Sequence, residues 1–116
     1  MFERIKKTME NLNNHHFGVQ TQSTRALIKF CEGHDQAAGP RVDSLRQCLK
    51  ALEAHDIREA VKHFRDVPLG GNGCFNDWLP RAGCEHENDE YACAVFEALV
   101  ERWSRLMSLS AEKSLP

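Results

Sequence analysis

The sequence predicts an all-α fold, built as an antiparallel bundle of four to five helices. The main observation is a long stretch near the C-terminus in which apolar residues recur every three or four positions, as on one face of a helix. These residues are Ala92, Val95, Phe96, Leu99, Val100, Trp103, Leu106 and Met107. Shorter segments earlier in the chain repeat this spacing. No other segment offers as much apolar surface, so we expect the remaining helices to pack against this one.

The size and composition of the chain are those of one small domain. It has 116 residues, of which 41% are hydrophobic. This is enough for a core that needs neither a metal nor a disulfide to hold it together. We expect a single helical domain over residues 1–110 and a frayed tail over residues 111–116.

Two helices are expected in the first third of the chain. Apolar residues spaced by three, four and three positions predict the first one, over about residues 2–13: Phe2, Ile5, Met9 and Leu12. Residues 13–18 include two Asn, two His and one Gly, which are weaker helix formers, and we expect them to end it. N-cap candidates at residues 21–23 then begin a second helix, and Gly33 ends it.

The next two helices are expected to form a hairpin. Pro40 suits the first position of a third helix that ends near Ala54, and His55 marks a tight turn. Asp56 and Glu59 have the spacing of a capping box at the start of a fourth helix, which ends near residue 64. Such a short connection places two helices side by side in antiparallel directions.

The long C-terminal helix is expected over about residues 88–110, with Asn88 or Asp89 as its N-cap. A Gly-rich loop at about residues 66–87 precedes it. A gap of this length inside a small domain is usually functional or contains structure of its own. The loop therefore needs a separate interpretation.

Three large apolar residues make this loop unusual. We expect Phe75, Trp78 and Leu79 to avoid water by packing on the core, in a short helical piece that Pro80 ends. Two alternatives stay open. The loop is either a turn that tucks Phe75 and Trp78 onto the core, or a partner-binding loop with Trp78 as its anchor. A phosphate-binding loop is disfavoured, because no Lys follows the glycines and no β-strand is predicted before them.

One run in the loop resembles a motif of short, uncharacterised bacterial helical proteins, roughly Gly-Gly-x-Gly-Ser-[Phe/Leu]-Asn-Asp. The run is Gly70, Gly71, Asn72, Gly73, Cys74, Phe75, Asn76, Asp77 and Trp78. The resemblance extends over about residues 45–107, and Cys74 stands where Ser is more usual. It implies the same architecture, an upstream helix joined by the loop to a C-terminal helix. It implies no established activity.

Charge is unevenly distributed along the chain, although the net charge is only −2 and gives no reason to expect nucleic-acid binding. Residues 1–65 carry 11 Lys and Arg against 8 Asp and Glu, whereas residues 66–116 carry 4 against 9. The acids at residues 85–90 form an edge that suits a protein with a basic surface. Alternatively, they only complement the dipole of the last helix. The candidate partner-binding residues are Asn72, Phe75, Asp77, Trp78, Glu85, Glu87 and Glu90.

Four residues offer the soft ligands that zinc prefers, in Cys-x-x-His and Cys-x-His spacings. They are Cys31 with His34 and Cys84 with His86. Neither pair has the usual spacing of a zinc knuckle, and Gly33 is expected to end the helix between the first two. The alternative is that cysteines on apolar helix faces act as small hydrophobic residues. These are Cys31, Cys48 and Cys93.

The remaining expectations concern function. Five cysteines without an apolar leader indicate a reducing cytoplasm, and no apolar run is long enough for a membrane span. We find no catalytic signature and expect a small non-catalytic protein-binding module, in the style of a bacterial antagonist or immunity protein that blocks a partner protein. The alternative is a zinc- or thiol-dependent regulatory protein. Homodimerisation through the last helix is compatible with either.

Overall fold

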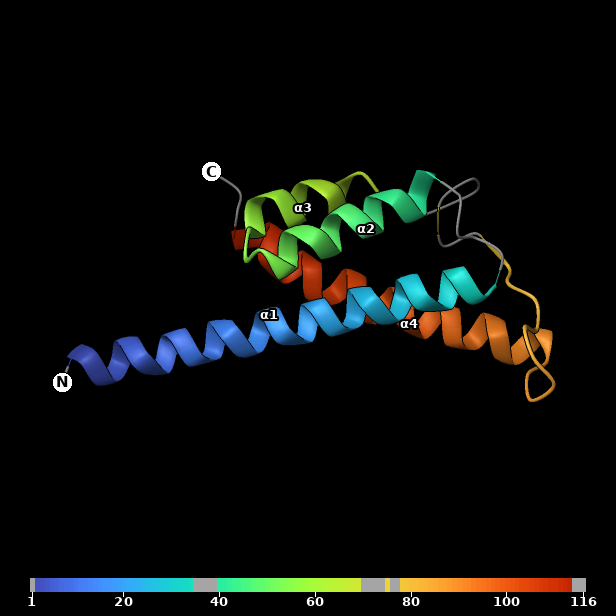
Figure 1. Cartoon of the computed structure of the whole chain (residues 1–116), viewed down its shortest axis with the longest axis horizontal. Coiled ribbons are helices and arrows are strands. Elements are labelled where there is room, and N and C mark those ends of the chain that lie inside the picture. Colours follow the sequence, from blue (N-terminus) through green and yellow to red (C-terminus); the bar gives the residue numbers. More distant parts are fainter. Residues whose placement is uncertain (1, 35–39, 70–74, 76–77, 114–116) are drawn as a thin grey trace.

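The computed structural model describes residues 2–34, 40–69, 75 and 78–113, and it confirms the all-α fold (Figure 1). Within these ranges the chain forms four helices and no strand. The helices are α1 (Phe2–Gly33), α2 (Pro40–Glu53), α3 (Ile57–Arg65) and α4 (Asp89–Lys113).

Helices α1 and α4 run antiparallel and form one side of the bundle (Figure 1). Near one end, Gln20 of α1 donates a hydrogen bond to the carbonyl oxygen of Leu106, 3.3 Å away. Near the other end, His34 after α1 meets Glu87 just before α4. Helix α2 packs on α1, and α3 packs on both α2 and α4, so each helix has two neighbours.

The predicted hairpin of α2 and α3 is confirmed. Asp56 caps α3, because its Oδ1 accepts a hydrogen bond from the backbone N–H of Glu59 at 3.2 Å. The turn is tight because His55 has a φ of 57°, in the left-handed region. The His55 ring stacks on Phe17 of α1, with ring centroids 4.7 Å apart. The turn is thereby held against the longest helix.

The prediction of two separate N-terminal helices is wrong, because α1 continues through residues 13–18 without a break. The weak helix formers there cost only a few tenths of a kcal/mol each, and Gly18 costs about 1 kcal/mol. Tertiary contacts outweigh these penalties. Gln20 is buried and donates a hydrogen bond to the Ser110 hydroxyl at 2.8 Å. The Thr24 hydroxyl donates a hydrogen bond to the carbonyl oxygen of Gln20 within the helix, at 2.7 Å.

The long C-terminal helix begins as predicted but ends later than predicted. Asn88 is its N-cap, since its Oδ1 accepts the N–H of Tyr91 at 2.7 Å. The helix runs on to Lys113, into the segment expected to fray, and Arg65 of α3 bonds the carbonyl oxygen of Ala111 at 3.3 Å. Residues 114–116 lie outside the described part of the chain.

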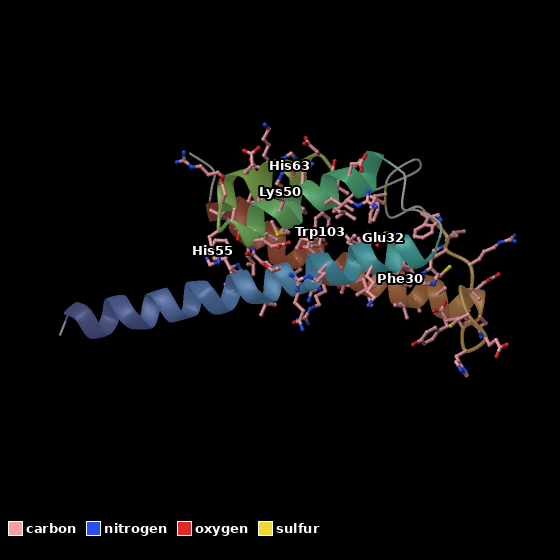
Figure 2. All side chains as sticks on the ribbon, viewed as in Figure 1. Phe30, Glu32, Lys50, His55, His63 and Trp103 are labelled. Atoms are coloured by element: carbon pink, nitrogen blue, oxygen red, sulfur yellow. The ribbon has the colours of Figure 1, made fainter. Side chains whose placement is uncertain are left out.

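The core contains buried side chains from all four helices and from the loop before α4. Figure 2 labels Trp103 in the interior of the bundle, where it is fully buried. Other apolar residues with almost no exposed surface include Leu27, Val42, Leu45, Leu52, Val61, Phe75, Phe96 and Met107. The apolar stripe that predicted α4 supplies three of the residues named here.

Candidate functional site

The candidate site lies at the end of the bundle where α1 ends and α4 begins (Figure 1). His34 joins the two. Its Nδ1 lies 2.7 Å from the carbonyl oxygen of Phe30, and its Nε2 lies 2.8 Å from Oε2 of Glu87. Both partner atoms are acceptors, so both contacts are satisfied when each ring nitrogen carries a proton. The imidazole also stacks on the Phe30 ring, which Figure 2 labels at this end of α1, with centroids 3.8 Å apart.

Glu87 is the other residue of this contact, which we call the His34–Glu87 joint, and it also makes hydrogen bonds with the loop that precedes it. Its carboxylate also accepts the backbone N–H of Gly83, and its own N–H bonds the carbonyl oxygen of Cys84, each at 3.2 Å. Its pKa is held below the ordinary glutamate range by the hydrogen bond from His34 first, and then by the Gly83 N–H. Asp89 acts similarly nearby, accepting the N–H of Ala82 at 2.8 Å.

Acid should therefore loosen this joint. The folded-state pKa of Glu87 is lowered, so its contribution to stability is complete above the ordinary glutamate pKa of ~4.3 and is lost as the pH falls through the lower folded-state value. We expect wild type to unfold at a higher temperature than Glu87→Gln at about pH 7, and the difference to shrink towards about pH 3. Thermal unfolding followed by circular dichroism checks this. An equal difference at both pH values would contradict it.

Gly83 lets the loop lie directly on the end of α1. A Cβ atom added at Gly83 would lie 3.1 Å from the carbonyl oxygen of Gly33 and 3.2 Å from Nε2 of His34. A side chain there would push the loop away from the joint. By contrast, a Cβ atom added at Gly18, inside α1, would meet nothing within 4 Å.

These two glycines should respond to alanine with opposite signs. Gly83→Ala should lower the free energy of unfolding by roughly 1 kcal/mol, because backbone and imidazole must move. Gly18→Ala should raise it by about 0.5–1 kcal/mol, because alanine is the better helix former and has room. Urea unfolding of both variants measures the two changes. Destabilisation by Gly18→Ala would mean that α1 is interrupted after all.

An aromatic cluster fixes the loop to the bundle. Phe75 is fully buried and Trp78 half-buried, with ring centroids 5.3 and 5.0 Å from that of Phe96 on α4. Phe30 completes the cluster from α1, 5.9 Å from Phe96 and 6.3 Å from Trp78. The loop is thus tucked onto the core at Phe75 and Trp78, as the first of the two alternatives predicts.

Leu79 departs from the expectation that all three large loop residues pack on the core, since 74% of its surface is exposed. The next residue, Pro80, is buried instead. On the first turn of α4, 56% of Tyr91 is exposed as well. An open groove beside them has both apolar and charged walls, formed by Leu79, Pro80, Arg81, Asp89, Glu90 and Cys93.

Two acids at this end of the bundle are exposed, Glu85 on the loop and Glu90, which lines the groove together with Arg81. Among the residues that the structure describes, Glu85 and Glu90 have no ion-pair or hydrogen-bond partner, unlike Glu87 and Asp89. We name the exposed set the loop edge and define it by Leu79, Glu85, Glu90 and Tyr91. It combines two exposed apolar side chains with two exposed carboxylates.

The structure sorts the seven candidate partner-binding residues into different environments. Asn72 and Asp77 lie outside the described residues. Phe75 is buried, and Glu87 is engaged by His34, so neither is presented to a partner here. The remaining three are Trp78, which is half-buried, and the exposed Glu85 and Glu90.

Sequence reasoning missed two residues of the loop edge and the role of His34. Tyr91 falls outside the apolar stripe of α4, and a large aromatic residue off the stripe was the available signal. Leu79 gave no such signal. His34 and Glu87 are 53 positions apart in the chain, and no local spacing connects them.

The four candidate zinc ligands are not brought together. The described residues contain no group of three or more His, Cys, Asp or Glu side chains placed to hold a metal. Cys31 is buried, and burial raises the pKa of its thiol to about 12, which disfavours the thiolate that zinc binds. Cys84 and His86 are exposed on the loop.

Two of the cysteines expected to serve as small hydrophobic residues do so. Cys31 and Cys48 are fully buried in the core, and burial raises the pKa of the Cys48 thiol to about 12 as well. Cys93 is half-buried, and its thiol donates to the carbonyl oxygen of Pro80 at 3.4 Å. It therefore helps to hold the floor of the groove.

Over the helical segments that the structure describes, none combines the length and the hydropathy needed to cross a membrane. Comparisons with protein-family models, with curated proteins and with solved structures found no match.

Proposed function

We propose that this chain is a small non-catalytic protein-binding module whose working surface is the loop edge. The observation that carries the proposal is the combination of exposed apolar side chains, Leu79 and Tyr91, with two exposed acids, Glu85 and Glu90. Exposed apolar groups rimmed by charge are typical of protein interaction sites. The partner we infer has an apolar pocket surrounded by Lys or Arg.

The way the loop is anchored supports this proposal. The His34–Glu87 contact, the Gly83 approach and the aromatic cluster hold the loop edge in one arrangement. A surface that is ordered before binding loses less conformational entropy when the complex forms. This suits a protein that must bind tightly enough to block its partner, as an antagonist or immunity-type protein does.

The test is affinity capture from the native cells, followed by binding kinetics with the captured protein in purified form. Leu79→Ala and Tyr91→Ala should each weaken binding by roughly tenfold or more, mainly through faster dissociation. The double variant Glu85→Lys/Glu90→Lys should slow association by roughly tenfold at low salt, and by less at high salt.

Matched controls exist at the other end of α4. Leu109 is also an exposed leucine, and Leu109→Ala should leave binding unchanged. Glu53→Lys/Glu112→Lys makes the same change in net charge at exposed sites away from the loop edge. If the edge variants and the controls bind equally well, the loop edge is not the working surface.

A further inference from the structure

His34 is held between two acceptors from different parts of the chain. Its Nδ1 meets the carbonyl oxygen of Phe30 on α1 at 2.7 Å, and its Nε2 meets Oε2 of Glu87 on the loop at 2.8 Å. A neutral imidazole carries one N–H and one lone pair, so either tautomer turns a lone pair towards an oxygen at one of these contacts. With Glu87 ionised, both contacts are attractive only when His34 is an imidazolium.

The surroundings of the ring favour its charged form and leave it little room to move. The His34 side chain is 9% exposed, and the ring stacks on Phe30 with centroids 3.8 Å apart, an arrangement that attracts a cation. A Cβ atom added at Gly83 would come within 3.2 Å of Nε2, so the loop backbone lies directly against the ring. Loss of the His34 proton must therefore displace either the ring or the loop.

Other charged and titratable groups lie at this end of the bundle, where Figure 2 labels Glu32. They are Cys31 and Glu32 on α1, Arg46 on α2, Cys84 on the loop and Asp89 on α4. Glu32 pairs with Arg46 at 3.5 Å, so these two charges offset each other. Burial raises the pKa of the Cys31 thiol to about 12, so it stays neutral where a histidine titrates. Asp35 lies outside the described residues. The carboxylate in contact with the imidazole is that of Glu87.

The contact holds one short piece of the loop in place. Oε2 of Glu87 also accepts the backbone N–H of Gly83 at 3.2 Å, so it ties both ends of residues 83–87 to the end of α1. Just before this piece, the N–H of Ala82 is bonded separately by a carboxylate of α4. Loss of the contact therefore frees residues 83–87, which carry Glu85 of the loop edge.

We propose that the His34–Glu87 joint is a pH-sensitive latch, which holds residues 83–87 in place while His34 is protonated and Glu87 is ionised. Acid releases the latch by protonating Glu87, and alkali releases it by removing the His34 proton. Histidine ordinarily changes charge between about pH 5 and 8, so the alkaline limb lies within or just above that range. This inference rests on the proposed function, because it adds regulation of the loop edge through Glu85.

The first test follows the backbone amide shifts of Gly83 and Glu87 by NMR in the purified full chain, from about pH 3 to about pH 8.5. Both amides are hydrogen-bonded in the latched loop. Their shifts should differ most from those of an unfolded chain near about pH 6, and approach them on either side. The amide of Ala82, bonded to Asp89 instead, is the internal reference and should stay in place on the alkaline side.

Three variants assign the two limbs of this profile. His34→Gln should abolish the alkaline limb and Glu87→Gln the acid limb, since each removes one titrating group. His86→Gln replaces an exposed histidine next to Glu87 and should keep both limbs. Circular dichroism must show that each variant remains folded. A wild-type profile without an alkaline limb would overturn the latch, and so would an alkaline limb that persists in His34→Gln.

Binding to the captured partner tests the regulatory step. Between about pH 6 and pH 8.5, the dissociation constant of wild type should rise severalfold relative to that of His34→Gln. The ratio of the two constants cancels any titration of the partner itself. A constant ratio beside a two-limbed NMR profile would overturn the regulation of the loop edge. If no partner is captured, the proposed function fails, while the NMR profile still decides whether the latch exists.

Discussion

Replacing Phe96 with alanine is expected to lower the free energy of unfolding by about 3–5 kcal/mol. Phe96 is 1% exposed and contacts the rings of Phe30, Phe75 and Trp78, so it joins α1, α4 and the loop. Its removal opens a cavity between elements that are far apart in the chain. Urea unfolding followed by circular dichroism measures the loss.

The Phe96 variant should also release the loop. Trp78 loses its edge contact with the Phe96 ring, so the tryptophan emission of the folded variant should shift to longer wavelength. Leu109→Ala, on the same helix but 49% exposed, is the control and should change stability by less than about 0.5 kcal/mol. A loss below about 1 kcal/mol for Phe96→Ala would show that the aromatic cluster does not hold the loop.

The elements that sequence reasoning located correctly are those whose signals are local. The stripe of α4 repeats over many turns, and the cap at Asp56 lies three residues from the N–H it accepts. The hairpin followed from the shortness of one connection. In each case the interaction partners are close in sequence, so that spacing alone carries the information.

The continuity of α1 was not visible because long-range burial decides it. Gln20, next to the residues that seemed to start a new helix, is buried and bonds Ser110 of α4, which lies 90 positions away in the chain. Local propensity treats the segment as a break, because it takes no account of contacts with a helix that is distant in the sequence. The same limit applies to His34 and Glu87, because neither residue indicates its partner.

The exposed part of the site was the hardest to predict. Sequence reasoning ranks Leu79 with Phe75 and Trp78 as a core residue, yet Leu79 is exposed and its neighbour Pro80 is buried. Which of several apolar residues in an irregular loop faces water depends on the path of the backbone. The acids were easier, since Glu85 and Glu90 were already expected to be available to a partner.

Replacing Trp103 with alanine should cost about as much as the Phe96 variant, roughly 3–5 kcal/mol, but at the other end of the core. Trp103 is fully buried and meets the ring of Phe64 on α3 edge-on, with centroids 5.2 Å apart. The expected loss arises from the cavity and from weaker docking of the α2–α3 hairpin. Urea unfolding measures it.

A second variant separates packing from hydrogen bonding at Trp103. Within the described residues its indole N–H has no hydrogen-bond partner, so Trp103→Phe gives up no such bond and keeps a ring against Phe64. We expect this variant to lose clearly less stability than Trp103→Ala, about 1–2 kcal/mol. Equal losses would mean that the indole N–H matters more than the packing.

The two positions together test whether the bundle is one cooperative unit. Phe96 and Trp103 are seven residues apart on α4, about 10 Å along the helix. Each single variant should still unfold in one transition, because α1 and α4 extend past both sites and couple them. If Phe96→Ala instead split the transition while Trp103→Ala did not, the loop end would unfold separately, and the loop edge would not be held in place for a partner.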